Sequence, residues 1–240
     1  MTKPAAQSSR RRIDGEGTTG TAKGPGSREG RIRAIYDALT ADFRAHPAPV
    51  VDLIAAQGAS PFHILVATML SARTKDATTA KVIREQLFPV VHGPDDLRRL
   101  SVEEIERLIF PVGFFHAKAQ YLKALPDALD AKFGGKLPET VEELCELPGV
   151  GRKTANLVVA QAFRKPGICV DVHVHRICNR LGLVETSTPL ETEMRLRELL
   201  PVELWRGWNG AFVSFGQRIC TPRNPKCAEC PIATHCPQGH

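Results

Sequence analysis

Lys153 stands where a lysine can act as a nucleophile. It follows the run Pro148-Gly149-Val150-Gly151 and opens an apolar pattern of helical period. A free lysine is charged at neutral pH, and only its neutral amine attacks carbon. The positive end of a helix and the neighbouring Arg152 both disfavour the charged form. The position therefore predicts a lysine that can form a Schiff base, and the alternative is a lysine that binds one phosphate.

Asp171 lies 18 residues after Lys153, beyond a helix that turns the chain back. A carboxylate there can stabilise positive charge that develops on a substrate and can assist proton transfer. By itself, an aspartate at the start of a helix is more often a plain N-cap. We predict that Asp171 is the catalytic partner of Lys153.

Four cysteines near the C-terminus have the spacing C-x6-C-x2-C-x5-C, and they are Cys220, Cys227, Cys230 and Cys236. Four thiolates this close predict a metal centre, but the spacing alone leaves Zn²⁺ and a four-iron four-sulfur cluster open. Arg218, Arg223 and Lys226 flank or lie in the first ligand loop, where they can face a phosphate. The other three cysteines, Cys145, Cys169 and Cys178, are expected to be inert core residues.

Two helices and a tight turn must position Lys153. Thr140 and Glu143 form a capping box for a short helix that Pro148 ends. Gly149 and Gly151 allow a sharp turn into the next helix, whose first N–H groups, with Val150 and Thr154 beside them, can bind a phosphate without reading a base. The alternative is an ordinary αα-hairpin.

The rest of the chain also reads as helical. Helices are expected from about residue 31, at 77–87, from about 94, and at 101–109, 189 onward and 201–218, with a central apolar helix opened by Ser60-Pro61. Pro126 should bend or break the helix that contains it. The segment 168–174 alternates like a strand but has no partner. The fold class predicted is all-α.

Two polar turns interrupt the helical pattern, at 71–76 and 113–118. The first is an abrupt polar patch after a buried helix, and a loop with a helix cap is the alternative interpretation. The second contains two adjacent phenylalanines, for which core packing is the default expectation.

Composition limits the class of protein. The net charge is +6, and residues 1–30 carry six Lys/Arg against three Asp/Glu, so half of the excess lies there. The segment 1–29 is therefore expected to be a disordered basic tail, while the rest suits local phosphate contacts. No apolar run approaches a membrane span, and we expect an intracellular protein of the cytoplasm or nucleoid.

The sequence around Lys153 resembles the DNA-binding helix-hairpin-helix. With Val170-Asp171-Val172-His173 and the cysteine spacing, the chain from about residue 30 onward looks like the endonuclease III family of DNA glycosylases. The resemblance implies two helical domains flanking a DNA-binding cleft: a helical barrel at 54–164, and a cluster domain from 30–53 plus 165–240. Between Zn²⁺ and an iron–sulfur centre, the resemblance favours one 4Fe–4S cluster in a C-terminal loop. It implies no nucleotide cofactor.

The resemblance also assigns residues on the two polar turns. It places Arg73, Phe114, His116 and Lys118 against DNA, and it assigns Ser71, Asp76 and His173 to the base pocket or its support. The chain departs from the family pattern in Arg73 for glutamine, Phe114 for leucine, Phe115-His116 for Tyr-Asn, and Val172 for threonine. These departures put lesion range and opposite-base preference in doubt, not catalysis.

The function implied is a bifunctional DNA glycosylase and AP lyase that acts on oxidised pyrimidines. Its partner is duplex DNA with damaged bases or abasic sites, and a monomer without membrane contact is expected. One rival is a monofunctional mismatch-directed glycosylase, against which Lys153 counts. The other is a non-catalytic iron–sulfur DNA-binding module, which would form no covalent adduct with abasic DNA.

Overall fold

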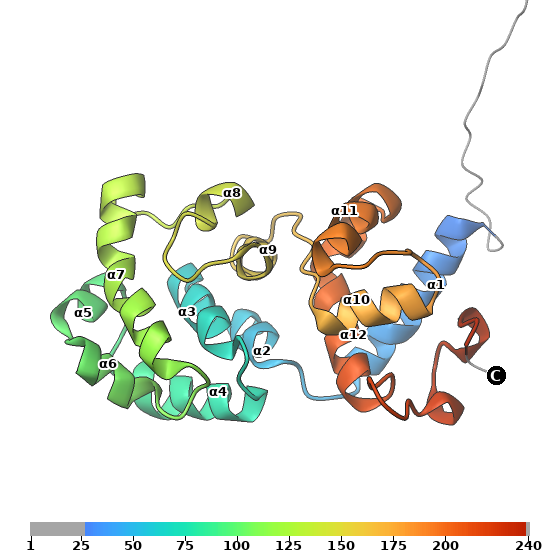
Figure 1. Cartoon of the computed structure of the whole chain (residues 1–240), viewed down its shortest axis with the longest axis horizontal. Coiled ribbons are helices and arrows are strands. Elements are labelled where there is room, and N and C mark those ends of the chain that lie inside the picture. The colour runs from blue at the N-terminus through green and yellow to red at the C-terminus, as the bar shows by residue number, and fades with distance from the viewer. Residues whose placement is uncertain (1–26, 239–240) are drawn as a thin grey trace, which may run out of the picture.

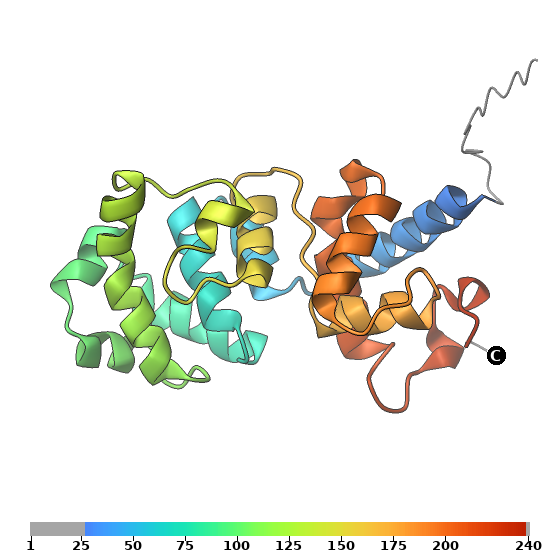
Figure 2. The same cartoon turned by 45° about the horizontal axis from the view of Figure 1, so that its top comes forward.

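The computed structural model describes residues 27–238, and within them all regular structure is helical. The helices form two bodies side by side along the long axis of the molecule (Figure 1; Figure 2). The expected all-α fold is confirmed. The predicted disordered tail lies outside the described residues except for its end, where Ser27 caps a helix that begins at Arg28, two residues before the boundary predicted from the sequence.

The first body surrounds a core built on α3 (Pro61–Ser71), which is buried almost all round. Ser60 caps this helix and Pro61 is its first residue, as the sequence predicts. The remaining helices of this body pack around it: α2 (Val50–Ala56), α4 (Asp76–Val82) with a π-helical turn η1 (Ile83–Leu87), α5 (Pro94–Arg99), α6 (Val102–Ile109), α7 (Phe115–Phe133), α8 (Val141–Leu144) and α9 (Arg152–Gln161).

The second body joins the two ends of the chain. α1 (Arg28–Arg44) lies beside α12 (Trp205–Arg218), although they are far apart in sequence (Figure 1). Its core centres on Trp208, which stacks on Tyr36 and on Phe212 at ring-centroid distances of 5.9 and 4.4 Å. The other elements are α10 (Val172–Arg180), α11 (Pro189–Leu199), and the short 3-10 helices η2 (Val202–Leu204), η3 (Cys227–Glu229) and η4 (Ala233–His235).

The structure differs from the sequence predictions at three places. Val50 and Val51 belong to the core of the first body, so a boundary at residue 53/54 would cut α2. Pro126 lies inside the single helix α7 and does not break it. Cys145 is exposed, whereas Cys169 and Cys178 are buried as expected.

The chain crosses between the bodies twice, before α2 and after α9. The segment 164–171 has no regular secondary structure, so the predicted alternation does not form a strand, and the segment leads into α10, which Asp171 caps. No helix within residues 27–238 combines the length and apolar character that a membrane span requires.

Candidate active site and DNA-binding face

The turn between α8 and α9 has the backbone that its glycines predict. Thr140 accepts a hydrogen bond from the Glu143 N–H at 3.3 Å and so caps α8, which is only four residues long. Gly149 has φ of +72°, and a Cβ added there would lie 2.4 Å from the Tyr121 ring. A side chain at this position would therefore be strained and would displace Tyr121.

The first turn of α9 faces solvent. Gly151 is extended, with φ −93° and ψ 171°, and its carbonyl accepts the first intrahelical bond from the Ala155 N–H. The N–H groups of Arg152, Lys153 and Thr154 have no intrahelical acceptor because they precede that bond. Val150 contributes only its backbone here, since its side chain is buried. This turn has the chemistry of an anion site.

Lys153 and Asp171 meet at the junction of the two bodies. Lys153 Nζ lies 3.9 Å from Asp171 Oδ2, and the lysine side chain is 57% exposed against 8% for the aspartate. The other carboxylate oxygen, Oδ1, accepts hydrogen bonds from His173 N–H at 2.8 Å and Val174 N–H at 2.9 Å. One oxygen thus caps α10 while the other faces the amine.

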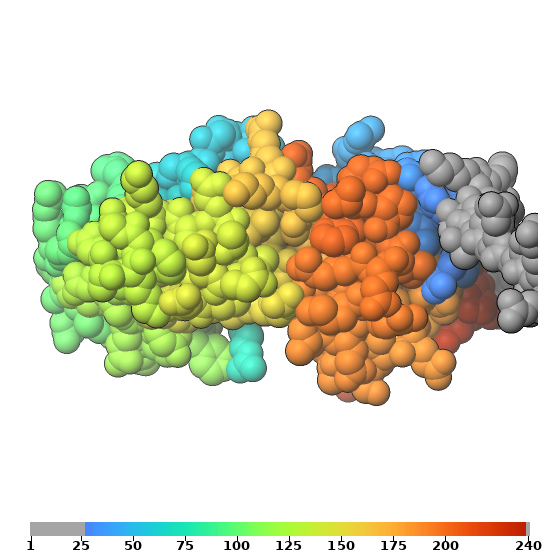
Figure 3. Space-filling model, turned by 90° about the horizontal axis from the view of Figure 1, so that it is seen from above, coloured from blue at the N-terminus to red at the C-terminus, as the bar shows by residue number. Residues whose placement is uncertain are grey.

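The surface is hollowed where the two bodies meet. Figure 3 shows a notch between them, with a projecting loop of the first body at its edge. An amine on an exposed helix end and a buried carboxylate together suit attack on an electron-poor carbon, with the developing positive charge held by the carboxylate.

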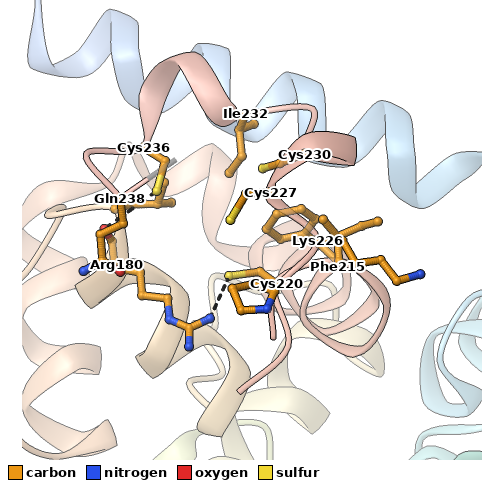
Figure 4. Close-up of a pocket in the computed structure, with 12 residues that line it drawn as sticks. Arg180, Phe215, Cys220, Lys226, Cys227, Cys230, Ile232, Cys236 and Gln238 are labelled. Carbon is orange, nitrogen blue, oxygen red and sulfur yellow. Dashed lines mark hydrogen bonds between the residues drawn. The ribbon is translucent and has the colours of Figure 1, made fainter. Parts of the chain in front are cut away.

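Four thiols gather around one pocket in the second body. Cys220, Cys227, Cys230 and Cys236 line a cavity of about 120 Å³ and point into it from different sides (Figure 4). Apolar Phe215, Ile219 and Ile232 complete the wall, and the Arg180 guanidinium donates to Cys220 Sγ at 3.4 Å. Four thiols around one pocket with apolar walls form a donor set that fits a 4Fe–4S cluster, and a tetrathiolate set is also known for Zn²⁺.

Comparison with known proteins decides the family. The profile of the HhH-GPD superfamily base excision DNA repair proteins matches residues 66–202, and that of the iron–sulfur binding domain of endonuclease III matches residues 220–236. Endonuclease III of Thermotoga maritima is 48% identical over 176 residues, which are 73% of this chain and 82% of that protein. The chain belongs to the endonuclease III family.

Solved structures agree with this assignment. A non-covalent endonuclease III–DNA complex and a trapped endonuclease III–DNA covalent intermediate each match with a TM-score of 0.78 and 35% identity. Each match covers 88% of this chain and 96% of the other. As an endonuclease III family member, the chain is a DNA glycosylase and lyase of base excision repair that carries a 4Fe–4S cluster.

Arg152 forms an ion pair with a residue of the second body. Its Nε donates to both carboxylate oxygens of Glu193 at 3.1 Å, so the guanidinium is paired within the protein. The effect of Arg152 on the charge of Lys153 and its contact with DNA stay predictions. The backbone N–H of Arg152, in the first turn of α9, has no intrahelical acceptor.

Lys118 is buried rather than presented to DNA. Its Nζ donates to the Leu70 and Ala72 carbonyls at 2.8 and 2.7 Å and to Thr74 Oγ1 at 3.2 Å. Burial lowers the pKa of Lys118 to about 8. The expected DNA contact is wrong, because this lysine satisfies the free carbonyls at the end of α3 and holds the following loop.

Arg218 is also occupied inside the protein. Its guanidinium donates to the Asp42 carboxylate and lies 3.0 Å from His46 Nε2, which ties α12 to the end of α1. The phosphate contact of Arg218 stays a prediction. Arg223 and Lys226 are exposed on the cluster loop, which leaves them free to meet a phosphate.

The two polar turns form one projecting unit. Arg73 and Phe114 both have positive φ, 55° and 60°, and the Arg73 guanidinium lies 5.2 Å from the centroid of the Phe114 ring. Phe114 is 62% exposed, so it does not pack in the core. His116 is exposed as well, and its Nδ1 lies 2.7 Å from Glu106 Oε1.

The three residues assigned to the base pocket or its support lie in different settings. Ser71 Oγ is buried and has no hydrogen-bond partner within the described residues. Asp76 is half-buried, and burial raises its pKa, opposed by the Val50 N–H and by Lys153. His173 packs against Gly216 and lies 3.1 Å from an Arg176 nitrogen; burial lowers its pKa, which suits a structural support.

The sequence analysis missed two residues that shape this face. Tyr121 supports the hairpin beneath Gly149, and nothing in its helical position distinguishes it from an ordinary surface aromatic. Glu193 binds Arg152 across the junction, and its only signal was an Arg four residues later on the same helix.

Proposed function

We propose that this chain removes oxidised pyrimidines from duplex DNA and then cuts the strand, with Lys153 as nucleophile and Asp171 as the charged group that assists it. The observation that supports the proposal most is the approach of Lys153 Nζ to Asp171 Oδ2, 3.9 Å, beside an exposed helix N-terminus. The likeness to a trapped covalent intermediate of endonuclease III and DNA supports a covalent route.

The reaction begins once the damaged nucleotide leaves the duplex, because its anomeric carbon is otherwise inaccessible. The neutral amine of Lys153 attacks C1′, the bond from C1′ to the base breaks, and the base departs with the electron pair and a proton. Asp171 stabilises the positive charge that develops on the sugar. The sugar ring opens to a protonated Schiff base, loss of a C2′ proton follows, and elimination breaks the C3′–O bond on the 3′ side.

The same face supplies the contacts that hold DNA. The free N–H groups at the start of α9, with Gly149, Gly151 and Thr154 around them, bind a phosphate near Lys153. Arg73 and Phe114 enter the gap left by the extruded nucleotide, and His116 lies beside them. One copy of the chain carries Lys153, Asp171 and the phosphate-binding turn, so we propose that a monomer suffices and that it acts inside the cell, where its DNA substrate lies.

The cluster has a structural role in this proposal. Cys220, Cys227, Cys230 and Cys236 would hold it in the pocket that they line, and when bound it orders the loop between them. That loop presents Arg223 and Lys226 to the phosphate backbone. No step of base removal or strand cleavage passes through the iron.

Borohydride trapping on DNA with a single lesion or abasic site tests the nucleophile. The natural protein should give a covalent adduct, and Lys153→Gln should give none and release no base, yet still bind duplex DNA through the hairpin N–H groups. Lys136→Gln, at an exposed position after α7, is the control for loss of one lysine charge and should behave as the natural protein. Trapping by Lys153→Gln would place the nucleophile elsewhere.

A further inference from the structure

Glu193 is a buried carboxylate that joins the two bodies. It lies on α11 and is 4% exposed, whereas its partner Arg152 is the first residue of α9. Arg152 Nε lies 3.1 Å from both carboxylate oxygens, and Arg152 NH2 lies 3.0 Å from Oε1. Because α9 packs in the first core and α11 in the second, this is a fixed contact between the bodies.

A second connection runs parallel to the first. Arg197, one turn after Glu193, donates from Nε to Glu193 Oε1 at 3.0 Å and from NH2 to Asn156 Oδ1 at 2.9 Å. Asn156 is fully buried on α9 and donates to the Arg152 carbonyl at 3.1 Å. Arg152, Glu193, Arg197 and Asn156 thus form one hydrogen-bond network. This network binds α9 to α11 at two residues of α9 that lie one turn apart, Arg152 and Asn156.

This hydrogen-bond network is connected to both Lys153 and Asp171. Lys153 follows Arg152 directly on α9. On the other side, Thr192 precedes Glu193 and its Oγ1 lies 2.7 Å from His175 Nδ1 on α10. The backbone N–H of His175 in turn donates to the backbone carbonyl of Asp171 at 2.9 Å. Glu193 therefore lies between the element that carries Lys153 and the element that carries Asp171.

We propose that Glu193 is a positioning residue that sets the approach of Lys153 to Asp171 by holding α9 against α11. This inference rests on the proposed function. Replacing a buried ion pair by apolar residues is often neutral or stabilising, so these charges are poorly explained by stability alone. Geometry explains them better, because an error of about 1 Å in the placement of a reacting group can cost about a hundredfold in rate.

Glu193→Gln tests the proposal, because it keeps the shape of the side chain and removes the charge that holds both arginines. Glu198→Gln is the matched control: it removes the same charge from the same helix, but its pair with Arg195 is exposed and stays within α11. The measurements are single-turnover base release at saturating DNA, borohydride trapping, affinity for a duplex with a tetrahydrofuran abasic analogue, and melting temperature.

We expect Glu193→Gln to slow single-turnover base release about 10- to 100-fold while its affinity for the duplex stays within about threefold. Glu198→Gln should match the natural protein in both. The loss of rate should persist well below the melting temperature of the variant. A lower melting temperature with an unchanged rate in the cold, or a loss confined to affinity, would overturn the positioning role.

A double-mutant cycle supplies the second readout. If Glu193 acts through Arg152, the double variant Arg152→Met with Glu193→Gln should be no slower than the slower single variant. Additive losses of rate would contradict the proposal. Should Glu193→Gln fail to fold, Glu193→Asp keeps the charge, withdraws it by one methylene and should still slow base release. Absence of trapping by the natural protein would instead refute the proposed function itself.

Discussion

Asp171 uses its two carboxylate oxygens for different purposes. Oδ1 receives the His173 and Val174 N–H groups and caps α10, while Oδ2 faces the Lys153 amine. An aspartate is suited to both tasks, since a cap needs an acceptor and the reaction needs a charge. The sequence presented N-cap and catalytic partner as alternatives, and the geometry makes them compatible.

Asp171→Asn separates the two tasks. Asparagine keeps an acceptor oxygen for the cap, so the melting temperature should change little. It carries no charge, so single-turnover base release should slow by about a hundredfold or more. Asp171→Ala is the companion variant and should lose the cap as well as the rate. A rate for Asp171→Asn within a few-fold of the natural protein would reduce Asp171 to a helix cap.

Arg73 offers a prediction about the base opposite the lesion. Its guanidinium is held over the Phe114 ring, and the fork of donors fits the paired acceptors of guanine better than the mixed face of adenine. We expect faster excision opposite guanine than opposite adenine, by about 5- to 150-fold for a contact of about 1–3 kcal/mol. Arg73→Gln should flatten this preference.

Single-turnover rates opposite all four bases, for the natural protein and for Arg73→Gln, check that prediction. If Arg73 instead binds a phosphate, the variant will weaken binding to every duplex alike and lower its salt dependence. An unchanged ranking of the four bases in Arg73→Gln would refute the role of Arg73 in reading the orphaned base.

The residues that the structure brings together as the sequence suggested are those with a local signal. Lys153 beside its glycines, Asp171 before its helix and the four cysteines stand in patterns that are complete within a short stretch of chain. The partners of Arg152, Lys118 and Arg218 could not be predicted, because they lie far away in sequence: Glu193, the end of α3 and Asp42. Exposure of a basic residue depends on contacts that its own neighbours in sequence do not reveal.

At the scale of elements, the two projecting loops are joined by backbone contact. The Gly113 N–H donates to Thr74 Oγ1 at 3.0 Å, and a Cβ on Gly113 would lie 2.4 Å from the Arg73 carbonyl oxygen. Lys118 holds the same Thr74 from below at 3.2 Å. Arg73 and Phe114 therefore keep their relative position only if residue 113 has no side chain.

Gly113→Ala should push these loops apart. Its methyl group cannot fit against the Arg73 carbonyl without a backbone shift, so base release should fall and the preference for the opposite base should weaken. Gly93→Ala is the control, because a Cβ there meets no atom within 4 Å. It should cost no more than about 1 kcal/mol in the free energy of unfolding. Equal activity of the two variants would show that the loops act independently.

Helices were predictable where their ends carry side-chain signals. Ser60, Ser101 and Thr188 cap their helices by accepting an N–H, as their spacing indicated. α2 was missed because it is seven residues long and begins after Pro49, which offers no side-chain cap. The helix through Pro126 was not predicted as continuous, because a proline removes one backbone donor and so signals a break, whereas α7 runs through this buried proline.

At the scale of the whole molecule, α2 connects the bodies through a carboxylate. Asp52 accepts from Gln161 Nε2 at 3.0 Å and lies against Gly210 of α12, where a Cβ would be 2.8 Å from its Oδ1. Burial raises the pKa of Asp52 to about 6, and the neighbouring Asp76 carboxylate adds to the rise. A contact between two bodies could not be predicted from the sequence, because no local pattern links residues 52, 161 and 210.

The raised pKa makes the junction sensitive to pH. Because the folded protein holds the Asp52 proton more tightly than the unfolded chain does, Asp52 favours folding below pH 3.8, and this contribution is lost as the pH rises to about 6. Asp52→Asn imitates the neutral acid and keeps an acceptor for Gln161. It should therefore be more stable than the natural protein at pH 8, by at most about 3 kcal/mol, and the difference should shrink towards pH 5.

Thermal unfolding of Asp52→Asn and of the natural protein between pH 5 and 8 measures this difference in stability. Asp37→Asn, at an exposed position on α1, is the control. A constant difference across that range would mean that Asp52 is already charged in the folded protein at pH 5.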